Sequence, residues 1–403
     1  MQFLGGVHQM NRRNYFLMCA VVFLQGFVFY GPIATLYRQA KGLSMYDIFF
    51  IESVSLILMI ALEIPWGWFA DRFGYKLTLA ISNFLFFLSK IVFYRADSFS
   101  LFLLERIILA LSIAGISGCD IALLYASIEK KESERYFGIY EAVSTLGFFL
   151  ASLASTAVVG VSMEFAAKLT IFPYGFAWIL TLFLQETGGR IEKKPFLLTS
   201  LKNAFNNGRM LLFIIAVALV TQVSHSTTIF LNQVQYMKSG INLRYYGIIM
   251  AGVQLLPVFS AKTYTITGKL GQSLSMKLFF GVISTACFIL SRTKNPAFSV
   301  LFIALIGTCY ALSRPIFLDI QNKSIITDSR ATLLSIYSMI INIICAVVNL
   351  IIGKAADISI ETAFTACGIA ATVAFILINV YFNFPIGKVP SGERGIQDGN
   401  SLI

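Results

Sequence analysis

Charged side chains are scarce in this chain. Only 13% of its 403 residues are Asp, Glu, Lys or Arg, and 57% are hydrophobic. An ordinary soluble domain has about 25% charged and about 45–50% apolar residues. So little charge cannot form a polar surface around a core of this size. The composition therefore excludes a soluble enzyme, a disordered protein and a nucleic-acid binder, and leaves a membrane protein with several spanning segments.

The sequence also lacks the usual frameworks for disulfides, metals and nucleotides. No two cysteines have CxxC spacing, so we expect neither a disulfide nor a zinc site. No G-x-x-x-x-G-K-[ST] loop is present, which excludes ATP binding by that route. We expect no cofactor and no bound metal. The six cysteines all fall inside apolar runs, where helix packing explains them: Cys19, Cys119, Cys287, Cys309, Cys345 and Cys367.

Long apolar runs without polar alternation predict spanning helices rather than the strands of a β-barrel. We expect an all-α membrane protein with twelve transmembrane helices in two six-helix bundles. The stretch after Arg12 and Arg13 is too long for a cleavable signal and is expected to be the first helix. The bundles comprise residues 1–184 and 210–384, with a linker at 185–209 and a tail at 385–403. The predicted helices are Asn14–Thr35, Tyr46–Phe69, Leu77–Tyr94, Phe99–Ser127, Tyr136–Gly160, Phe165–Leu184, Met210–Leu231, Leu243–Ile266, Leu274–Ser291, Pro296–Ile320, Ala331–Gly353 and Thr362–Phe384.

The basic residues predict the orientation in the membrane. Most of the 31 Lys and Arg fall in the linker and in the loops on its side, so the positive-inside rule places both termini in the cytoplasm. The net charge of +11 then reflects topology and attraction to anionic lipid, with no nucleic-acid partner required. Within the linker, Phe196–Phe205 is expected to form a short amphipathic surface helix.

One loop carries a recognisable motif, between the second and third predicted helices. It reads Gly67-Trp-Phe-Ala-Asp71-Arg72-Phe-Gly74-Tyr-Lys76. Gly67 would permit a close helix approach and Gly74 a tight turn, while Asp71 would meet the positive N-terminus of another helix. A weak copy, Gly268-Lys-Leu-Gly271, follows the eighth predicted helix and indicates that the two halves are repeats.

This loop resembles the signature G-x-x-x-D-R-x-G-x-K of the major facilitator superfamily, and the twelve-helix plan of bacterial-type members fits the whole chain. The resemblance implies two bundles that rock about a central cavity in alternating access. It also implies that Asp71 bonds the start of the eleventh helix, Arg330-Ala331-Thr332, and latches the outward-open state. The sequence departs from the signature at Tyr75, which replaces a basic residue, and Gly268 replaces the acid in the second half.

Ionisable residues inside spanning helices are costly, so each is a functional candidate. Two readings stay open: a proton or ion relay with a charged cavity wall, or structural pairing. For pairing, Arg106 could take Glu105 or Glu52, and Arg314 could take Asp319. The candidates for coupling or for cavity charges are Glu63, Arg106, Asp120, Arg314 and Asp319, and a proton relay is expected to use Glu63 first and Asp120 second.

A polar stripe on the seventh predicted helix is expected to line the cavity, because a polar face inside a membrane must meet protein or water. Its residues Gln222, His225, Ser226 and Gln233 lie at helical spacing with Asn232 beside them, and Asn342 adds a polar group from the eleventh helix. His225 is either a satisfied histidine or a transport residue. The string Gly115-Ile-Ser-Gly118 resembles an intramembrane protease motif, but helix packing explains it and we expect no enzyme.

The sequence as a whole predicts a secondary active transporter of the cell membrane, acting as a monomer. Proton-coupled export of small amphiphilic compounds is the first expectation, so the partners are a small-molecule substrate, protons and the bilayer. The fifth helix reads Gly147-Phe-Phe-Leu-Ala-Ser152. It therefore lacks the G-P-x-x-G-G signature that is associated with antiporters of the family that the chain resembles. Ion-coupled uptake of a polar solute therefore remains an alternative, and a non-transporting membrane sensor is an alternative from another class.

Overall fold

The computed structural model describes residues 11–129, 132–186, 208–256, 260, 262–324 and 330–383, without the side chains of 330–332. These residues form helices and turns, with no strand among them. Ten segments of this part are long and apolar enough to cross a membrane. An all-α membrane fold is therefore confirmed, since only helices that satisfy their own backbone groups can span in this way.

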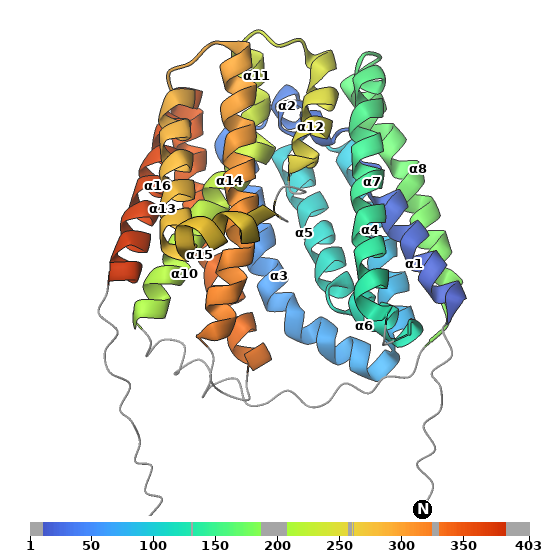
Figure 1. The fold of residues 1–403 in the computed structure, drawn as a ribbon. Helices are drawn as coiled ribbons and strands as arrows, with labels where there is room; N and C mark the ends of the chain where they lie inside the picture. The colour runs from blue at the N-terminus through green and yellow to red at the C-terminus, as the bar shows by residue number, and fades with distance from the viewer. Residues whose placement is uncertain are drawn as a thin grey trace, which may run out of the picture.

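The first half contains the blue and green elements of Figure 1. Most of its helices run the full height of the bundle, because their apolar stretches match the thickness of a bilayer. Its elements are α1 (Arg12–Gln25), the short 3-10 turn η1 (Gly31–Ile33), α2 (Ala34–Ala40), α3 (Met45–Phe73), α4 (Tyr75–Arg95), α5 (Phe99–Ile116), α6 (Cys119–Ser127), α7 (Ser133–Val159) and α8 (Met163–Leu182).

The second half contains the yellow to red elements, gathered on the other side of the view (Figure 1). It includes one π-helical turn, η3, between two α-helices. Its elements are α10 (Gly208–His225), η3 (Ser226–Leu231), α11 (Asn232–Lys238), η4 (Leu243–Tyr245), α12 (Tyr246–Gln254), α13 (Thr263–Leu290), α14 (Pro296–Lys323), α15 (Arg330–Ile358) and α16 (Ile360–Asn383). The predicted linker helix and the predicted tail lie outside the described residues.

Three predicted helices are interrupted. The first ends at Gln25 and resumes as α2, and the Tyr174 hydroxyl donates to the freed Gln25 carbonyl at 2.6 Å. The fourth breaks at Gly118, whose φ of 82° favours glycine. The eighth ends as α12 at Gln254, and α13 begins at Thr263. Sequence periodicity missed these breaks because apolar composition continues through them.

The weak internal repeat has a geometric counterpart. Gly74 separates α3 from α4 with φ 90° and ψ 163°, and Gly271 produces a kink in α13 with φ 77° and ψ 159°. Both residues occupy a backbone region that is essentially restricted to glycine. The two halves therefore turn the chain in the same way at corresponding positions, as the paired motifs predicted.

The two halves meet at one end of the molecule. We call the end where α8 finishes and α10 begins the linker end, and the opposite end the far end (Figure 1). Near the far end, the Tyr46 amide of α3 donates to Asp357 of α15 at 2.9 Å, and the Ser53 hydroxyl donates to the Ala346 carbonyl at 2.9 Å. Towards the linker end, α3 exposes Trp68, which is 58% accessible. The halves are thus closed together at the far end.

Candidate functional site

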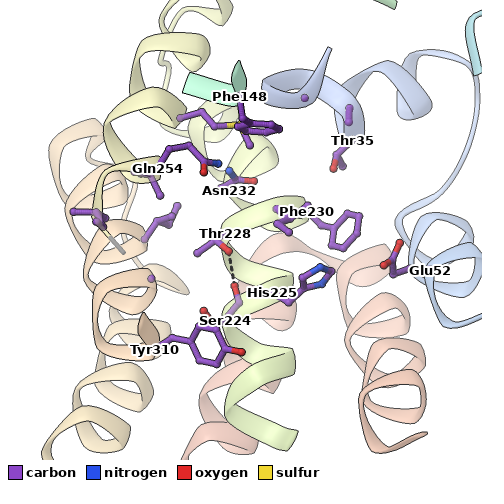
Figure 2. A pocket seen from close by; sticks show the side chains of 18 of the residues that line it. Thr35, Glu52, Phe148, Ser224, His225, Thr228, Phe230, Asn232, Gln254 and Tyr310 are labelled. Carbon is purple, nitrogen blue, oxygen red and sulfur yellow. Dashed lines mark hydrogen bonds between the residues drawn. The ribbon is translucent and has the colours of Figure 1, made fainter. Parts of the chain in front are cut away.

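A cavity of about 800 Å³ lies between the two halves. It extends from the far-end contacts, at Tyr30 and Tyr236, towards Arg314 and Leu318 near the linker end of α14. Both halves contribute to its wall, which places the cavity on the approximate axis of the repeat. Figure 2 shows part of this wall, with Glu52 and Thr35 from the first half facing Thr228, Asn232 and Gln254 from the second.

The wall from the first half is charged. Five ionisable side chains line it, from α2, α3, α4 and α5, because α3 and α4 both pack along α5. Four of them expose 8% or less of their surface. A charge buried to this extent is costly unless a partner compensates it. The five are Arg38, Glu52, Lys90, Glu105 and Arg106.

Two ion pairs join these side chains. Arg106 Nη2 lies 2.9 Å from Glu52 Oε2, and Arg38 Nη2 lies 3.9 Å from Glu105 Oε2. Of the two pairings left open for Arg106, the structure contains the one with Glu52. The Arg38 guanidinium also lies over the rings of Phe93 and Phe102, at 5.0 and 5.9 Å from their centroids. These rings replace part of the water that a surface arginine would have.

Lys90 has no carboxylate within ion-pair distance among the described residues. It is 4% exposed, and its Nζ donates to the Tyr30 hydroxyl at 3.1 Å. The Nζ also lies 4.8 Å from the centroid of the Tyr174 ring and 4.9 Å from that of Phe86. Aromatic faces and one hydroxyl therefore take the place of a counterion.

The wall from the second half is largely uncharged. His225 ends α10 just before the π-helical turn η3, a type of irregularity that is common at functional sites. The turn is supported by the Thr228 hydroxyl, which donates to the Ser224 carbonyl at 2.7 Å. The His225 ring and the Glu52 carboxylate lie on facing sides of the pocket (Figure 2). Apolar groups make up much of the remaining surface, including Met250, Val253, Ile303 and Leu318.

Of the predicted polar residues, His225 and Asn232 line the cavity. Gln222 and Ser226 are buried inside the second half, where the Gln222 amide donates to the Ser226 hydroxyl at 2.7 Å and to Asn349. Asn342 is half-buried and is not part of the wall. A polar stripe can satisfy itself within one bundle, and the sequence pattern does not separate that case from a cavity lining.

The predicted coupling charges are divided in the same way. Arg106 and Arg314 line the cavity, whereas Glu63 is exposed on α3 and lies outside it. Asp120 accepts from the Tyr140 hydroxyl at 3.4 Å, away from the wall. Asp319 accepts from Gln272 and Lys323 at 2.6 and 2.7 Å, so it does not pair with Arg314.

The motif loop lies at the linker end. No hydrogen bond or ion pair joins Asp71 to any side chain that the structure describes, a set that leaves out those of Arg330–Thr332. The Arg72 guanidinium lies over Trp68, 5.4 Å from the ring centroid. Among the described residues the close helix approach expected at Gly67 is not seen, since a Cβ there would meet none of their atoms within 4 Å.

The carboxylate of Glu186 caps the start of α4 beside this loop. It accepts from the amides of Tyr75 and Lys76 at 3.0 and 2.9 Å, and it lies where a Cβ on Gly74 would go. The close glycine packing that the structure does contain is at Gly115, against Ser82 and Trp66. Helix packing therefore accounts for Gly115, which opens the glycine–serine string.

Sequence reasoning assigned no cavity role to Arg38 or Lys90, and considered Glu105 only as a partner for Arg106. Lys90 lies five residues before the end of α4, and Arg38 lies beyond the end of the first predicted helix. In the sequence both therefore look like basic residues that flank a membrane-spanning helix at the water interface. Arg38 is buried because the chain continues past the break after Gln25 into α2, whereas Lys90 is buried by Tyr30, Phe86 and Tyr174. Among the side chains that the structure describes, no group of three or more His, Cys, Asp or Glu could hold a metal ion.

Comparison with known proteins gives three results. Residues 15–349 match the family model described as Major Facilitator Superfamily. A protein of Bacillus subtilis (strain 168), described as the uncharacterized MFS-type transporter YxaM, is 29% identical over an alignment of 201 residues, and the match covers 46% of this chain. The match spans about half (49%) of that relative.

Solved structures share the fold at low sequence identity. The crystal structure of the nucleoside transporter NupG has a TM-score of 0.78 at 14% identity and covers 93% of this chain and 100% of its own. The peptide transporter POT in complex with sulfate has a TM-score of 0.70 at 14% identity, with coverage of 94% and 95%. Similarity at this level establishes the architecture of two helical halves around a central cavity.

Proposed function

Because the chain belongs to the Major Facilitator Superfamily, we propose that it is a secondary active transporter that moves small amphiphilic molecules through the central cavity by alternating access. The family match and the fold support a multi-pass membrane transporter of this superfamily type. We further propose that transport is coupled to protons and directed outwards, and that the protein lies in the cell membrane with both termini in the cytoplasm, as the sequence predicts.

The unlike walls of the cavity are the observation that supports an amphiphilic substrate. The first half presents five charged side chains, and the second presents mainly apolar and neutral polar groups. A molecule with a polar head and an apolar body can satisfy both walls at once, whereas a wholly apolar molecule would leave the charges without partners. A volume of about 800 Å³ suits a small organic molecule.

Alternating access is supported by the way the halves meet. The contacts at Tyr46 and Ser53 close the far end, while the linker-end part of α3 exposes Trp68. The cavity wall continues towards that end as far as Arg314 and Leu318. In the proposed cycle, the state closed at the far end alternates with a second state. In that second state the far end is open and Asp71 contacts the start of α15.

For the coupling step, Glu63 and Asp120 remain proposals from the sequence, and the cavity favours Glu52. Glu52 forms an ion pair with Arg106 at 2.9 Å, and His225 faces it across the pocket. A substrate that takes Arg106 from Glu52 would leave a buried carboxylate without its cation, and such a group gains a proton. Substrate and proton occupancy would be linked through one pair of side chains.

Purified protein in proteoliposomes tests the function. We expect amphiphiles that raise the melting temperature to move across the membrane faster when a pH gradient is imposed, because only ligands of the native state raise it. Ligand binding without movement in either direction would contradict transport and favour a sensor. The charged wall also favours a second candidate, ion-coupled uptake of a polar solute, which would be seen as accumulation of compounds that lack an apolar body.

A further inference from the structure

The ionisable side chains of the first-half wall do not balance. Arg38, Lys90 and Arg106 carry three positive charges, and Glu52 and Glu105 carry two negative charges. Each carboxylate already has an arginine within 4.0 Å, which leaves Lys90 as the cation without a counterion among the described residues. Arg314 adds another cation, but it is exposed near the linker end and can keep its water.

Lys90 is held facing the cavity rather than withdrawn into a protein contact. It lines the wall beside Tyr30, which also lines it, and the rings of Phe86 and Tyr174 pack against its Nζ on the side of the protein. An ammonium group has three N–H donors, and Lys90 makes one hydrogen bond within the part of the chain that the structure describes. Two donors and one unit of charge therefore remain for a ligand.

Neighbouring donors have the same unmet capacity. Among the described residues, the buried Nε atoms of Arg38 and Arg106 have no hydrogen-bond partner, and neither do Oε2 of Glu52 and both carboxylate oxygens of Glu105. The carboxylates nevertheless have their arginines within ion-pair distance, so the charge that is left over is positive. Buried donors that carry charge are costly unless they are paired, and oxygen atoms that carry negative charge pair with them most strongly. Water could hydrate the cavity, but water brings no charge to balance the surplus.

We propose, building on the transport function proposed above, that the substrates of this cavity are amphiphilic monoanions. The anionic head, a carboxylate or a similar singly charged group, binds beside Lys90 and neutralises the surplus cation. The apolar body lies against Met250, Val253 and Ile303 in the opposite wall. A single negative charge matches the surplus, whereas an amine would add a further cation to a wall that already has one too many.

Matched ligands that share one body and differ in the head test this directly. We would measure binding of biphenylacetate, biphenylacetamide and biphenylethylamine to the purified protein by thermal shift and titration, and repeat the series with a straight alkyl body. The carboxylate should bind about tenfold or more tightly than the amide, and the amine should bind most weakly. Proteoliposome uptake of the same compounds gives a separate measure of transport.

Lys90→Met assigns the preference to one residue, and Lys41→Met is its matched control, since Lys41 pairs with Glu164 outside the cavity at 3.2 Å. In Lys90→Met the advantage of the carboxylate should fall to about twofold or less, and the melting temperature without ligand should rise because a buried cation is gone. Lys41→Met should change neither. If Lys90→Met does not fold, Lys90→Gln is measured instead. The preference for the carboxylate is tested by the matched ligands on the wild-type protein, whether or not either variant folds.

The outcomes separate the inference from the function. Transport of the amide or the amine with no preference for the carboxylate would overturn the monoanion site and leave the transporter intact. A preference that survives in Lys90→Met would overturn the role of Lys90. If no head group on either body binds or moves, the proposed transport of amphiphiles fails, and the inference fails with it.

Discussion

Gln233 of the second half accepts the backbone amide of Thr35 of the first half, with its Oε1 2.8 Å from the Thr35 nitrogen. The same oxygen lies 3.4 Å from the Leu36 nitrogen, and the Gln233 amide donates to the Gly31 carbonyl at 3.4 Å. One side chain, 1% exposed, thus fills the break between the two pieces of the first helix. It pairs backbone groups that the break leaves free.

Gln233→Leu should therefore loosen the far end. Losing these bonds is worth about 1 kcal/mol or more, a several-fold change in the ratio of the two access states. The measurement is the distance distribution between spin labels at Asp97→Cys and Asn242→Cys, which should gain a longer population. Gln235→Leu is the matched control, because Gln235 bonds Ser299 inside its own half. Equal distributions in the two variants would contradict the role of Gln233.

Two carboxyls, those of Glu52 and Glu63, are candidates for the coupling step, and their glutamine variants distinguish them. Glu52→Gln should abolish uphill transport and its dependence on a pH gradient, because the carboxylate that pairs with Arg106 is lost. Glu63→Gln, on the same helix but outside the cavity, is the matched control and should retain both. Uphill transport of labelled substrate in proteoliposomes distinguishes them. If Glu63→Gln loses uphill transport and Glu52→Gln retains it, the coupling residue is Glu63, as the sequence predicts.

The motif loop gives a pair of glycine predictions. Gly74→Ala should destabilise the fold by about 1–3 kcal/mol, since φ is 90° and a Cβ would meet the Glu186 carboxylate. Gly67→Ala has open space and a helical neighbourhood, so it should be neutral or stabilise by about 0.5–1 kcal/mol. Thermal unfolding compares the two. If Gly67→Ala folds normally yet transports poorly, Gly67 makes its close contact in the other access state.

Asp71→Asn tests the latch itself. It should largely abolish transport while leaving folding and ligand binding intact, because the amide cannot match the attraction of a carboxylate for a helix N-terminus. Asp97→Asn, an exposed change at the far end, is the control of the same chemistry. Near-normal transport by Asp71→Asn at matched expression would remove the latch from the mechanism.

A cysteine introduced in the linker tests the orientation. Placed within Gln185–Arg209, it should react with impermeant thiol reagents only after the cytoplasmic side is exposed, as the basic residues of the linker predict. Five of the six native cysteines are buried, so their background labelling should be low. Labelling in intact cells would reverse the topology.

The spanning segments and the motif loop could be predicted because both are local in sequence. Apolar length predicts a helix wherever it occurs, and Gly74 has the conformation that its turn requires. The charged wall could not be predicted in the same way, because it depends on contacts between helices. Arg106 was recognised inside its helix, but its partner among two carboxylates was decided by packing. Arg38 reached the cavity only because the first helix breaks and α2 continues to Ala40.

The far-end closure has a consequence for the response to electrolyte. Its cross-half bonds are amide-to-amide at Gln233 and hydroxyl-to-carbonyl at Ser53, with a single carboxylate at Asp357. Dissolved ions weaken attraction between exposed charges and have little effect on buried neutral hydrogen bonds. The far-end closure itself should therefore weaken little as ionic strength rises.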